Sequence, residues 1–309
     1  MLIYRIVRAK AARSSVIRVP WTWSWHLGLK ENDRFLASFP RSGSTWLRFM
    51  LFETMSGEDA GFRKIEHRLP EIHRHRSGLP ILDGGGRLIK THENYRNHYK
   101  RAVLLVRDPR DVFFSVYAGY KTFGLHTILS KGDQDSFLEA FLTTNVIHSG
   151  TWQHHTKSWL ESPLMKNGNL LVIRYEDLRK NPEPLIEELL HFVGIKPAPG
   201  AIRRAIENNT LQQMRKKEEK EKQSGQRSIL LGDRKHTDDT GRFVRKGAVA
   251  GWRDKMTPAQ LKMVDQYAGE MMTVLGYESG ASAIAAGAGV LASAAEEQKP
   301  QAEAQALTV

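Results

Sequence analysis

The sequence predicts an α/β fold in which a central, mostly parallel β-sheet is flanked by helices. The strand candidates 102–107 and 169–175 contain the continuous apolar runs 102–106 and 170–173, which are typical of strands that are buried on both faces of a parallel sheet. Segments with a helical pattern separate the strand candidates, and this alternation indicates an α/β protein. A composition of 40% hydrophobic and 26% charged residues is that of an ordinary globular chain.

The elements follow in order along the chain. The first strand is the apolar run that begins at Phe35, and further strands are predicted at 87–90, 102–107 and 169–175. Helices are predicted at 46–55, 109–120, 136–149 and 152–160. A later helix begins at Pro182 and ends at Gly194, and another is capped by Thr257 with Pro258 at its first position.

The chain is expected to have three parts. Residues 1–33 form a basic, aromatic segment, in which Trp21, Trp23 and Trp25 suit either a strand that covers the core or an interfacial membrane contact. Residues 34–278 form the folded domain. Residues 279–309 are rich in Ala and poor in large apolar side chains, so we expect a disordered tail with at most a fraying alanine helix. No apolar run is long enough for a transmembrane helix.

Charge and cysteine content narrow the function classes. A formal net charge of +12 favours an anionic partner, which could be nucleic acid, a membrane surface or a polyanionic small molecule. The chain has no cysteine, which excludes disulfides and thiolate metal sites and agrees with a reducing, cytoplasmic location.

A short polar loop joins the first strand to the first helix and indicates an anion site. Backbone N–H groups and the positive end of the helix dipole meet at such a junction. Gly43 lets a ligand oxygen approach the backbone, Ser42, Ser44 and Thr45 add hydroxyl groups, and Arg41 adds a planar cation. The alternative is a polar turn with a simple N-cap. The loop lacks the second glycine and the lysine of a Walker A motif, which disfavours a magnesium-dependent kinase or ATPase.

A second anion site is predicted where the strand at 102–107 ends. Arg107 stands at the end of that strand, and Ser115 lies about two turns into the helix that Pro109 begins. Ligands of open α/β sheets bind at this edge. Alternatively, Arg107 forms a structural ion pair with Asp108 or Asp111.

A third basic segment, 241–253, is punctuated by glycines and has neither helical nor strand periodicity. Its cations and backbone can wrap a phosphate around Arg245, Lys246 and Gly247. A solvated basic loop is the alternative.

The three segments occur in the order found in sulfotransferases that use 3′-phosphoadenosine 5′-phosphosulfate (PAPS), and together they resemble that family. Residues 39–46 are similar to its 5′-phosphosulfate loop, Arg107 and Ser115 to its 3′-phosphate segment, and residues 245–252 to its Arg-Lys-Gly-x-x-Gly-x-Trp loop. Ala250 stands at the place of the second glycine. The resemblance spans residues 34–275. It implies a P-loop-NTPase-like sulfotransferase fold, PAPS as donor and its product PAP, with no metal.

The resemblance also implies catalytic roles. Residues 90–92 are similar to the Lys-Thr-His segment of the family, so His92 is expected to be the general base. Lys90 and Arg41 would stabilise charge on the transferring group, and Arg41 would act only as an electrostatic clamp because guanidinium does not donate its proton.

Further positions are implied to contact the nucleotide. Tyr175 belongs to a Tyr-Glu-Asp segment that resembles the one contacting adenine in the family. Thr210 and Leu211 begin a segment similar to Ser-Phe-x-x-Met, which also touches the nucleotide. Since leucine replaces the phenylalanine there, adenine stacking is expected to rest mainly on Trp46.

Several alternatives and partners accompany this interpretation. A non-catalytic nucleotide or nucleic-acid binding protein and an atypical P-loop kinase are the rivals. We expect a small-molecule or carbohydrate acceptor and no nucleic-acid partner, with the acceptor wall at 63–83 and 123–141. Cations in the first of these ranges favour an anionic acceptor, although a solvated face explains them equally well. Residues 215–227 form either a solvated helix end or the start of a cap over the donor.

No metal site is predicted. Arginines that neighbour His73 and His75 repel a metal cation. His154 and His155 are adjacent in a predicted helix and cannot share one face of it.

Overall fold

The computed structural model describes residues 24–122, 132–147, 149–225, 228, 231 and 242–287. These residues fall into two units. The first unit takes in the described residues of 1–107, 147–150 and 154–247, and the second takes in those of 108–146, 151–153 and 248–309.

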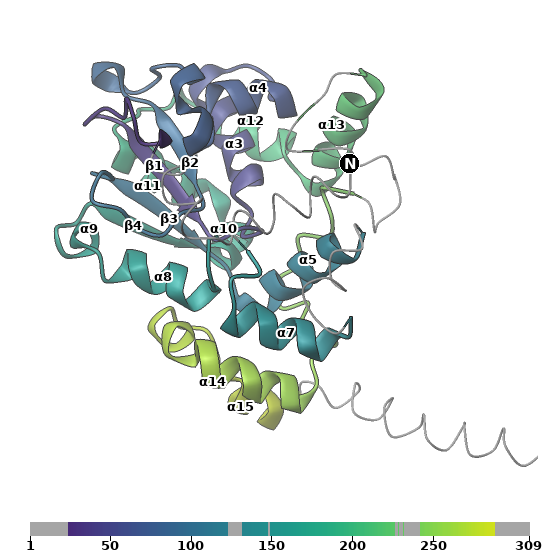
Figure 1. The fold of residues 1–309 in the computed structure, drawn as a ribbon. Coiled ribbons are helices and arrows are strands. Elements are labelled where there is room, and N and C mark those ends of the chain that lie inside the picture. Colours follow the sequence, from purple (N-terminus) through teal and green to yellow (C-terminus); the bar gives the residue numbers. More distant parts are fainter. Residues whose placement is uncertain are drawn as a thin grey trace, which may run out of the picture. The chain divides into compact units, whose positions relative to one another are not determined.

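A four-stranded parallel sheet forms the centre of the first unit. The strand order is β2-β1-β3-β4 (Figure 1). The apolar runs of the sequence become these strands, as predicted: β1 (Arg34–Ser38), β2 (Leu88–Thr91), β3 (Ala102–Val106) and β4 (Leu170–Arg174). Every residue of β3 is buried, which is expected of a continuous apolar run in an inner strand.

Helices cover both faces of this sheet. Successive residues of a strand point to opposite faces, and apolar side chains on each face pack against helices. Leu36 packs into a core that includes side chains of α3 (Ser44–Ser56) and α11 (Pro182–Val193). Phe35 points the other way, with its ring 4.4 Å from that of Tyr99. Tyr99 stacks at 5.4 Å on Trp159 of α8 (Trp152–Leu160).

The remaining helices of the first unit follow the punctuation of the sequence. Pro182 occupies the first turn of α11, and Gly194 ends it with a φ of 88°, as predicted. The others are short segments between the strands and after them: α4 (Phe62–Arg68), η1 (Ile72–Ser77), η2 (Asp83–Gly85), α9 (Pro163–Lys166), α10 (Tyr175–Lys180), α12 (Ala201–Asn208) and α13 (Leu211–Gln223).

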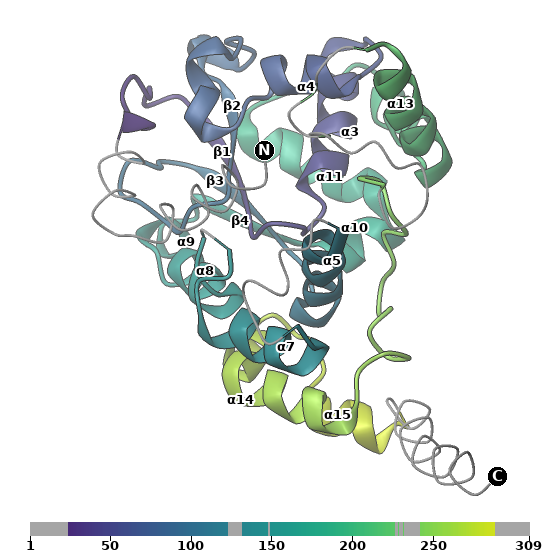
Figure 2. The same cartoon turned by 45° about the vertical axis from the view of Figure 1, so that its right-hand side comes forward.

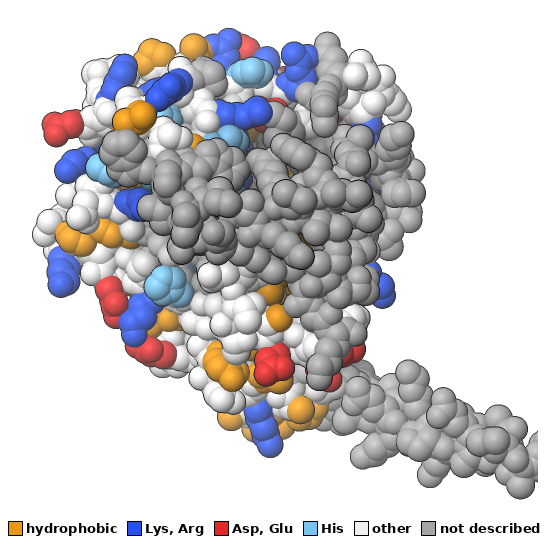
Figure 3. Space-filling model, in the orientation of Figure 1, with side chains coloured by type: hydrophobic (Ala, Val, Ile, Leu, Met, Phe, Trp, Pro, Cys, Tyr) orange, Lys and Arg blue, Asp and Glu red, His pale blue; other side chains and the backbone are white. Residues whose placement is uncertain are grey.

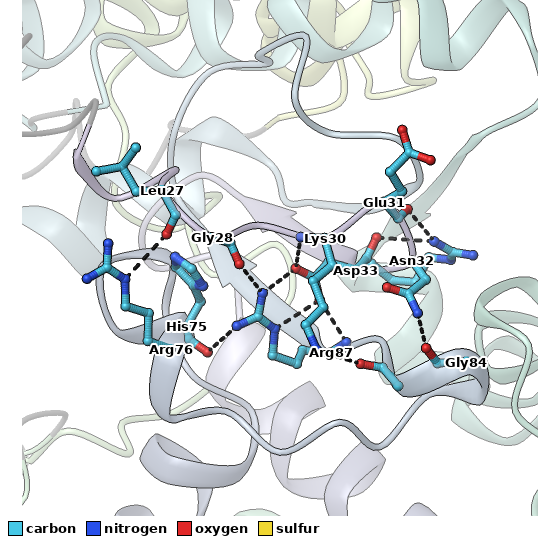
Figure 4. A network of polar contacts seen from close by, with 12 residues as sticks. Leu27, Gly28, Lys30, Glu31, Asn32, Asp33, His75, Arg76, Gly84 and Arg87 are labelled. Carbon is cyan, nitrogen blue, oxygen red and sulfur yellow. Dashed lines mark hydrogen bonds and ion pairs between the residues drawn. The ribbon is translucent and has the colours of Figure 1, made fainter.

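A buried ion pair between Arg87 and Asp33 joins the residues before β1 to the residues before β2. Arg87 Nε donates to Asp33 Oδ1 at 3.0 Å, and its Nη2 donates to Asp33 Oδ2 at 2.6 Å (Figure 4). The same guanidinium donates to the carbonyl oxygens of Gly28 and His75 at 2.9 and 3.0 Å. Trp21 and Trp23, for which the sequence left a strand or a membrane contact open, lie outside the described residues.

The second unit is helical. It contains α5 (Pro109–Thr122), α7 (Gln134–Thr143), α14 (Pro258–Val274) and α15 (Gly280–Ala285) (Figure 2). Thr257 and Gln260 form a reciprocal capping box at the start of α14. Helix α7 is shorter than the predicted 136–149, because Thr144 adopts an extended backbone with φ −125° and ψ 169° and ends it.

The first residues of the Ala-rich tail form the helix α15. The Asp265 carboxylate of α14 accepts from the backbone N–H groups of Gly280 and Ala281 at 2.7 and 3.0 Å, which anchors the start of α15. Gly280 also lies so close to α14 that a Cβ there would sit 2.6 Å from the Leu261 carbonyl oxygen. Residues 280–285 therefore form a short helix held by α14, while residues 288–309 lie outside the described part of the chain and the disorder expected of the tail stays a prediction. Within the described residues, no helix combines the length and the apolar character that crossing a bilayer requires.

Candidate functional site

The loop between β1 and α3 has the geometry of an anion site. Arg41 and Gly43 both take up left-handed backbone conformations, with φ of 74° and 96°. Helix α3 starts directly after Gly43, and no described side chain caps that end. The first turn of a helix leaves its N–H groups without intrahelical acceptors, and these groups attract negative charge.

Hydroxyl groups line the same loop. Ser42 is completely buried, and its Oγ forms no hydrogen bond with any described residue. A buried hydroxyl without a partner is costly, which is understandable where a ligand oxygen is to be bound. Ser44 is buried as well, whereas Thr45 is half-buried. The hydroxyl groups that were predicted to bind an anion therefore all lie in the short segment 42–45.

Tyr175, the first residue of α10, packs directly on this loop. A Cβ built on Gly43 would lie 2.6 Å from the tyrosine ring, so only glycine allows this approach. The Tyr175 hydroxyl donates to the carbonyl oxygen of Gly247 at 3.0 Å. Two predicted anion-binding segments, around Gly43 and around Gly247, therefore meet at one aromatic side chain.

Arg107 and Trp46 complete the group around Tyr175. Arg107 follows β3, donates from Nη1 to the Arg41 carbonyl oxygen at 3.0 Å, and lies 4.5 Å over the Tyr175 ring. The Trp46 ring lies edge-on to that of Tyr175 at 6.1 Å, and its Nε1 donates to the Asn209 carbonyl oxygen at 2.7 Å. The structure thus brings together residues that the sequence predicted from four separate segments.

The segment after Asn209 forms the start of α13. Thr210 caps this helix by accepting from the backbone N–H of Gln213, and Leu211 is its first, half-buried residue. Both predicted nucleotide contacts therefore adjoin the carbonyl that holds the indole of Trp46.

Helix α13 also holds the basic loop 242–247. Glu218 is buried and its carboxylate accepts from the backbone N–H groups of Phe243 and Val244 at 2.9 and 2.8 Å. Arg215 donates to the Arg245 carbonyl oxygen at 3.5 Å, while Lys246 is exposed. Sequence reasoning missed Glu218, because it stands in a run of alternating lysines and glutamates that looks like a solvated helix face.

The orientation of His92 is determined by a main-chain carbonyl. Its Nδ1 lies 2.6 Å from the Ser38 carbonyl oxygen at the end of β1. A carbonyl can only accept, so Nδ1 carries the hydrogen, and a neutral imidazole then has its lone pair on Nε2. This is the protonation state in which His92 can remove a proton through Nε2.

Lys90 lies on β2, two residues before His92, and forms an ion pair with Glu71, which the sequence did not indicate as a site residue. Its Nζ lies 2.6 Å from Glu71 Oε1, and burial lowers the pKa of Lys90 below its usual value. Burial opposes the charge of Glu71 as well, but Lys90 first, and then His92 and Arg48, bring the pKa of Glu71 below its usual value. Glu71 follows Pro70 in an irregular segment, and no periodicity of the sequence links it to β2.

Ser115 and the end of the third basic segment belong to the second unit. Ser115 is a half-buried residue of α5, whereas Arg107 belongs to the first unit, so a joint 3′-phosphate site of the two stays a prediction. Asp108 accepts from Arg110 Nη2 at 2.7 Å, and the Arg110 guanidinium lies 3.6 Å over the Trp252 ring.

Ala250 stands where the Arg-Lys-Gly-x-x-Gly-x-Trp loop of the similar family has its second glycine. Its φ is 55°, in the left-handed region that glycine adopts without strain. In this chain an alanine thus adopts a backbone conformation that glycine would adopt more readily. Elsewhere, no group of three or more His, Asp or Glu side chains within the described ranges is arranged to hold a metal ion.

Comparison with known families gives one match over most of the chain. The family model of the sulfotransferase domain matches residues 31–276. Sulfotransferase 2A1 of Macaca fascicularis is 26% identical over 259 residues, which cover 80% of this chain and 86% of that protein. Sulfotransferase 1A1 of Rattus norvegicus is 27% identical over 258 residues, which cover 78% and 85%.

Solved structures with the same fold agree with this match. Mouse sulfotransferase SULT7A1, complexed with PAP, gives a TM-score of 0.55 at 23% identity and covers 79% of this chain and 84% of its own. Retinol dehydratase in a complex with retinol and PAP gives a TM-score of 0.61 at 19% identity, with coverage of 82% and 86%. These likenesses show the fold that the parallel sheet and its helices form.

Proposed function

Since this chain belongs to the sulfotransferase family, we propose that it transfers the sulfuryl group of PAPS to a hydroxyl or amine group of its acceptor. The observation that carries the proposal is the gathering of Gly43, Trp46, Arg107 and Gly247 around Tyr175. These residues come from four segments of the chain, and each segment was expected to bind a phosphate group or the adenine of a single bisphosphorylated nucleotide.

The residues of this group divide between the two ends of the donor. The loop 41–46 offers N–H groups, hydroxyls and a guanidinium to the 5′-phosphosulfate. Arg107, Ser115 and the segment Arg245–Lys246–Gly247 are assigned to the 3′-phosphate, and the rings of Trp46 and Tyr175, with Thr210 and Leu211, to the adenine. The Oγ of Ser42, which has no hydrogen-bond partner among the described residues, supports this fit, because it is a buried hydroxyl in the loop that would receive the sulfonate.

The proposed chemistry is an in-line displacement at sulfur. His92 takes the acceptor proton on Nε2 while the acceptor oxygen or nitrogen forms its bond to sulfur. The bond from sulfur to the bridging oxygen breaks, and its electron pair stays with the 5′-phosphate. Arg41, Lys90 and the N–H groups at the start of α3 stabilise the charge that develops on these oxygens, so positioning and electrostatics supply most of the catalysis, as in phosphoryl transfer.

The acceptor is proposed to be a small molecule or a carbohydrate. Retinol and androsterone are acceptor-sized ligands named in complexes of retinol dehydratase, a protein with the same fold. The exposed cations Arg63, Arg74 and Arg76 favour an acceptor that carries negative charge. A cytoplasmic location and the lack of a nucleic-acid partner stay predictions.

The decisive experiment incubates the full chain with PAPS that carries labelled sulfur and a panel of metabolites and glycans. We expect label to appear in at least one acceptor without added metal. Binding of the nucleotide with no transfer to any acceptor would support a non-catalytic binding protein instead. Transfer of phosphate from ATP in the presence of magnesium would support the kinase alternative.

A further inference from the structure

The indole of Trp46 is held by one hydrogen bond to the main chain. Its Nε1 donates to the Asn209 carbonyl oxygen at 2.7 Å. An indole has a single donor and no acceptor, so this bond restricts how the ring can tilt. Trp46 is otherwise half-buried, with the Tyr175 ring edge-on at 6.1 Å and the Arg179 guanidinium 5.1 Å from its ring centroid. The position of the ring that is proposed to support the adenine thus depends on how firmly one carbonyl is held.

Asn209, which supplies this carbonyl, is completely buried at the junction of α12 and α13. Its side-chain Nδ2 donates to the Ala205 carbonyl oxygen of α12 at 2.7 Å. Its Oδ1 accepts from Lys217 Nζ of α13 at 2.8 Å. Both ends of this one amide are engaged, so the junction is tied to the helix before it and to the helix after it.

Lys217 extends the network to the helix that carries Trp46. Figure 3 shows Lys and Arg side chains scattered over the outer surface of the described residues, but the side chain of Lys217 is only 19% exposed. Its Nζ lies 2.5 Å from Glu53 Oε1 and 5.4 Å from the ring centroid of Phe49. Trp46, Phe49 and Glu53 stand at positions i, i+3 and i+7 of α3 and share one face of it. The contacts therefore run from Trp46 through Asn209 and Lys217 back to α3.

Glu53 accounts for the inward direction of this lysine. Its side chain is buried, and its Oε1 also accepts from the backbone N–H of Ala60 at 2.9 Å. Among the described residues, Lys217 is the only cation within ion-pair distance of Glu53. A buried carboxylate attracts an ammonium group strongly, because little water screens the two charges. The pair thus draws Lys217 toward α3, where its ammonium group also reaches Asn209 Oδ1.

We propose that Lys217 is a positioning residue that holds the Trp46 indole in place for the nucleobase of the donor. The proposal rests on the function proposed above, which assigns Trp46 to the adenine. Base stacking on an aromatic ring contributes roughly 5- to 150-fold to affinity, and a ring that is held before binding loses less freedom when the base arrives. Lys217 would thus strengthen binding of the nucleobase and leave the phosphate groups to the other segments.

The test compares two ligands by calorimetric titration, PAP and an abasic analogue in which hydrogen replaces the adenine. Lys217→Met removes the ammonium group and keeps an unbranched side chain. It should weaken PAP binding about tenfold and change the affinity for the abasic analogue less than about twofold. Loss of positive charge or of local structure would weaken both ligands alike, so the ratio of the two affinities separates positioning from these effects.

Trp46→Phe tests whether Lys217 acts through the indole, because this variant keeps an aromatic ring but lacks the N–H group. Lys217→Met should weaken PAP binding about tenfold in the parent chain and less than about twofold in the Trp46→Phe chain. Equal losses in the two backgrounds would show that Lys217 acts independently of Trp46 and would overturn the proposal.

Two further variants separate positioning from misfolding and from a change in charge. Lys217→Met leaves the Glu53 carboxylate buried without a counter-charge, whereas Glu53→Gln/Lys217→Met removes both charges and should show the same fall in the affinity ratio. Lys196→Met removes the same charge from an exposed lysine of the first unit and should leave the ratio unchanged. Thermal unfolding verifies that each variant is folded.

A measurement without ligand separates this proposal from the proposed function. The indole N–H of Trp46 gives a signal in proton–nitrogen NMR spectra, and its loss in Trp46→Phe assigns it. Lys217→Met should shift this signal and speed its exchange with water, because the hydrogen bond to the Asn209 carbonyl opens more often. An unchanged signal, or equal weakening of PAP and the abasic analogue, contradicts the positioning role. If the parent chain binds no PAP, the proposed function fails, while the signal still shows whether Lys217 positions Trp46.

Discussion

Lys90 and Glu71 form an ion pair in which each side chain keeps the other charged. Lys90 is almost completely buried, and an isolated ammonium group in that position would tend to lose its proton. The carboxylate of Glu71, at 2.6 Å, favours the charged form. The pair therefore maintains a cation next to His92, where the proposed transfer develops negative charge.

Glu71→Gln should lower the free energy of unfolding by roughly 3 kcal/mol at neutral pH, because it leaves the Lys90 ammonium buried without a counter-charge. The pKa of Glu71 is lower in the folded state than in the unfolded state. Its contribution is therefore complete above the usual carboxyl pKa and is lost as the pH falls, so the difference between the two proteins should shrink in acid.

Urea unfolding at neutral and at acidic pH measures this difference. Glu58→Gln is the matched control, because Glu58 pairs with Lys64 at 2.9 Å on the exposed surface, where the loss of an ion pair has little effect on stability. A Glu71→Gln effect that does not change with pH would contradict the assigned role.

His92→Ala should reduce kcat by about 10²–10⁴-fold while the affinity for PAP stays within a factor of about two, since a general base contributes to the chemical step and not to donor binding. Steady-state kinetics and calorimetric titration with PAP measure the two quantities. His154→Ala, at an exposed histidine of α8, should leave both unchanged. Equal loss of nucleotide binding and turnover would assign His92 to donor binding instead.

At the scale of elements, the loop 242–247 depends on α13 for its position. Both oxygens of the Glu218 carboxylate accept backbone N–H groups of the loop, and Lys222 Nζ lies 2.7 Å from one of them. A basic loop of this kind would otherwise extend into solvent. The helix thus places Gly247, and with it the hydroxyl of Tyr175, at the proposed donor site.

Glu218→Gln should weaken PAP binding by roughly tenfold, because hydrogen bonds to a charged acceptor contribute about 1.5–3 kcal/mol each and glutamine offers only one acceptor oxygen. Titration with PAP measures the change, and kcat at saturating PAPS should hardly move. Glu188→Gln, which changes an exposed residue of α11, should leave PAP affinity unaltered.

The left-handed backbone at Ala250 predicts a stabilising substitution. Ala250→Gly should raise the free energy of unfolding by roughly 0.5–1 kcal/mol, because the relief of left-handed strain exceeds the entropy that glycine loses on folding. Thermal unfolding measures the effect. Ala248→Gly, two residues earlier and without a positive φ, should not stabilise the protein.

At the scale of the whole molecule, local signals and long-range contacts differ in how well the sequence reveals them. The four strands, the loop at Gly43 and the limits of α11 were predictable, because apolar runs, Gly and Pro act within a few residues. The pairing of Glu71 with Lys90, and of Glu218 with the basic loop, joins residues that are 19 or more positions apart. Neither pair leaves a local signal, and α15 depends in the same way on Asp265 of α14.

The whole chain should be stabilised by PAP, which is 3′,5′-adenosine bisphosphate, and not by ATP with magnesium or by oligonucleotides. A ligand at about 100 times its Kd adds about 2.7 kcal/mol to the free energy of unfolding. A thermal-shift series over nucleotide concentration measures this. Equal stabilisation by ATP with magnesium would contradict a donor site specific for a 3′-phosphate.

The oxygen that orients His92 belongs to the main chain, so any amino acid at position 38 would supply it. A substitution of the buried Ser38 that leaves β1 intact should therefore preserve the tautomer of the imidazole. The walls around the acceptor could then change while the proposed general base keeps its orientation.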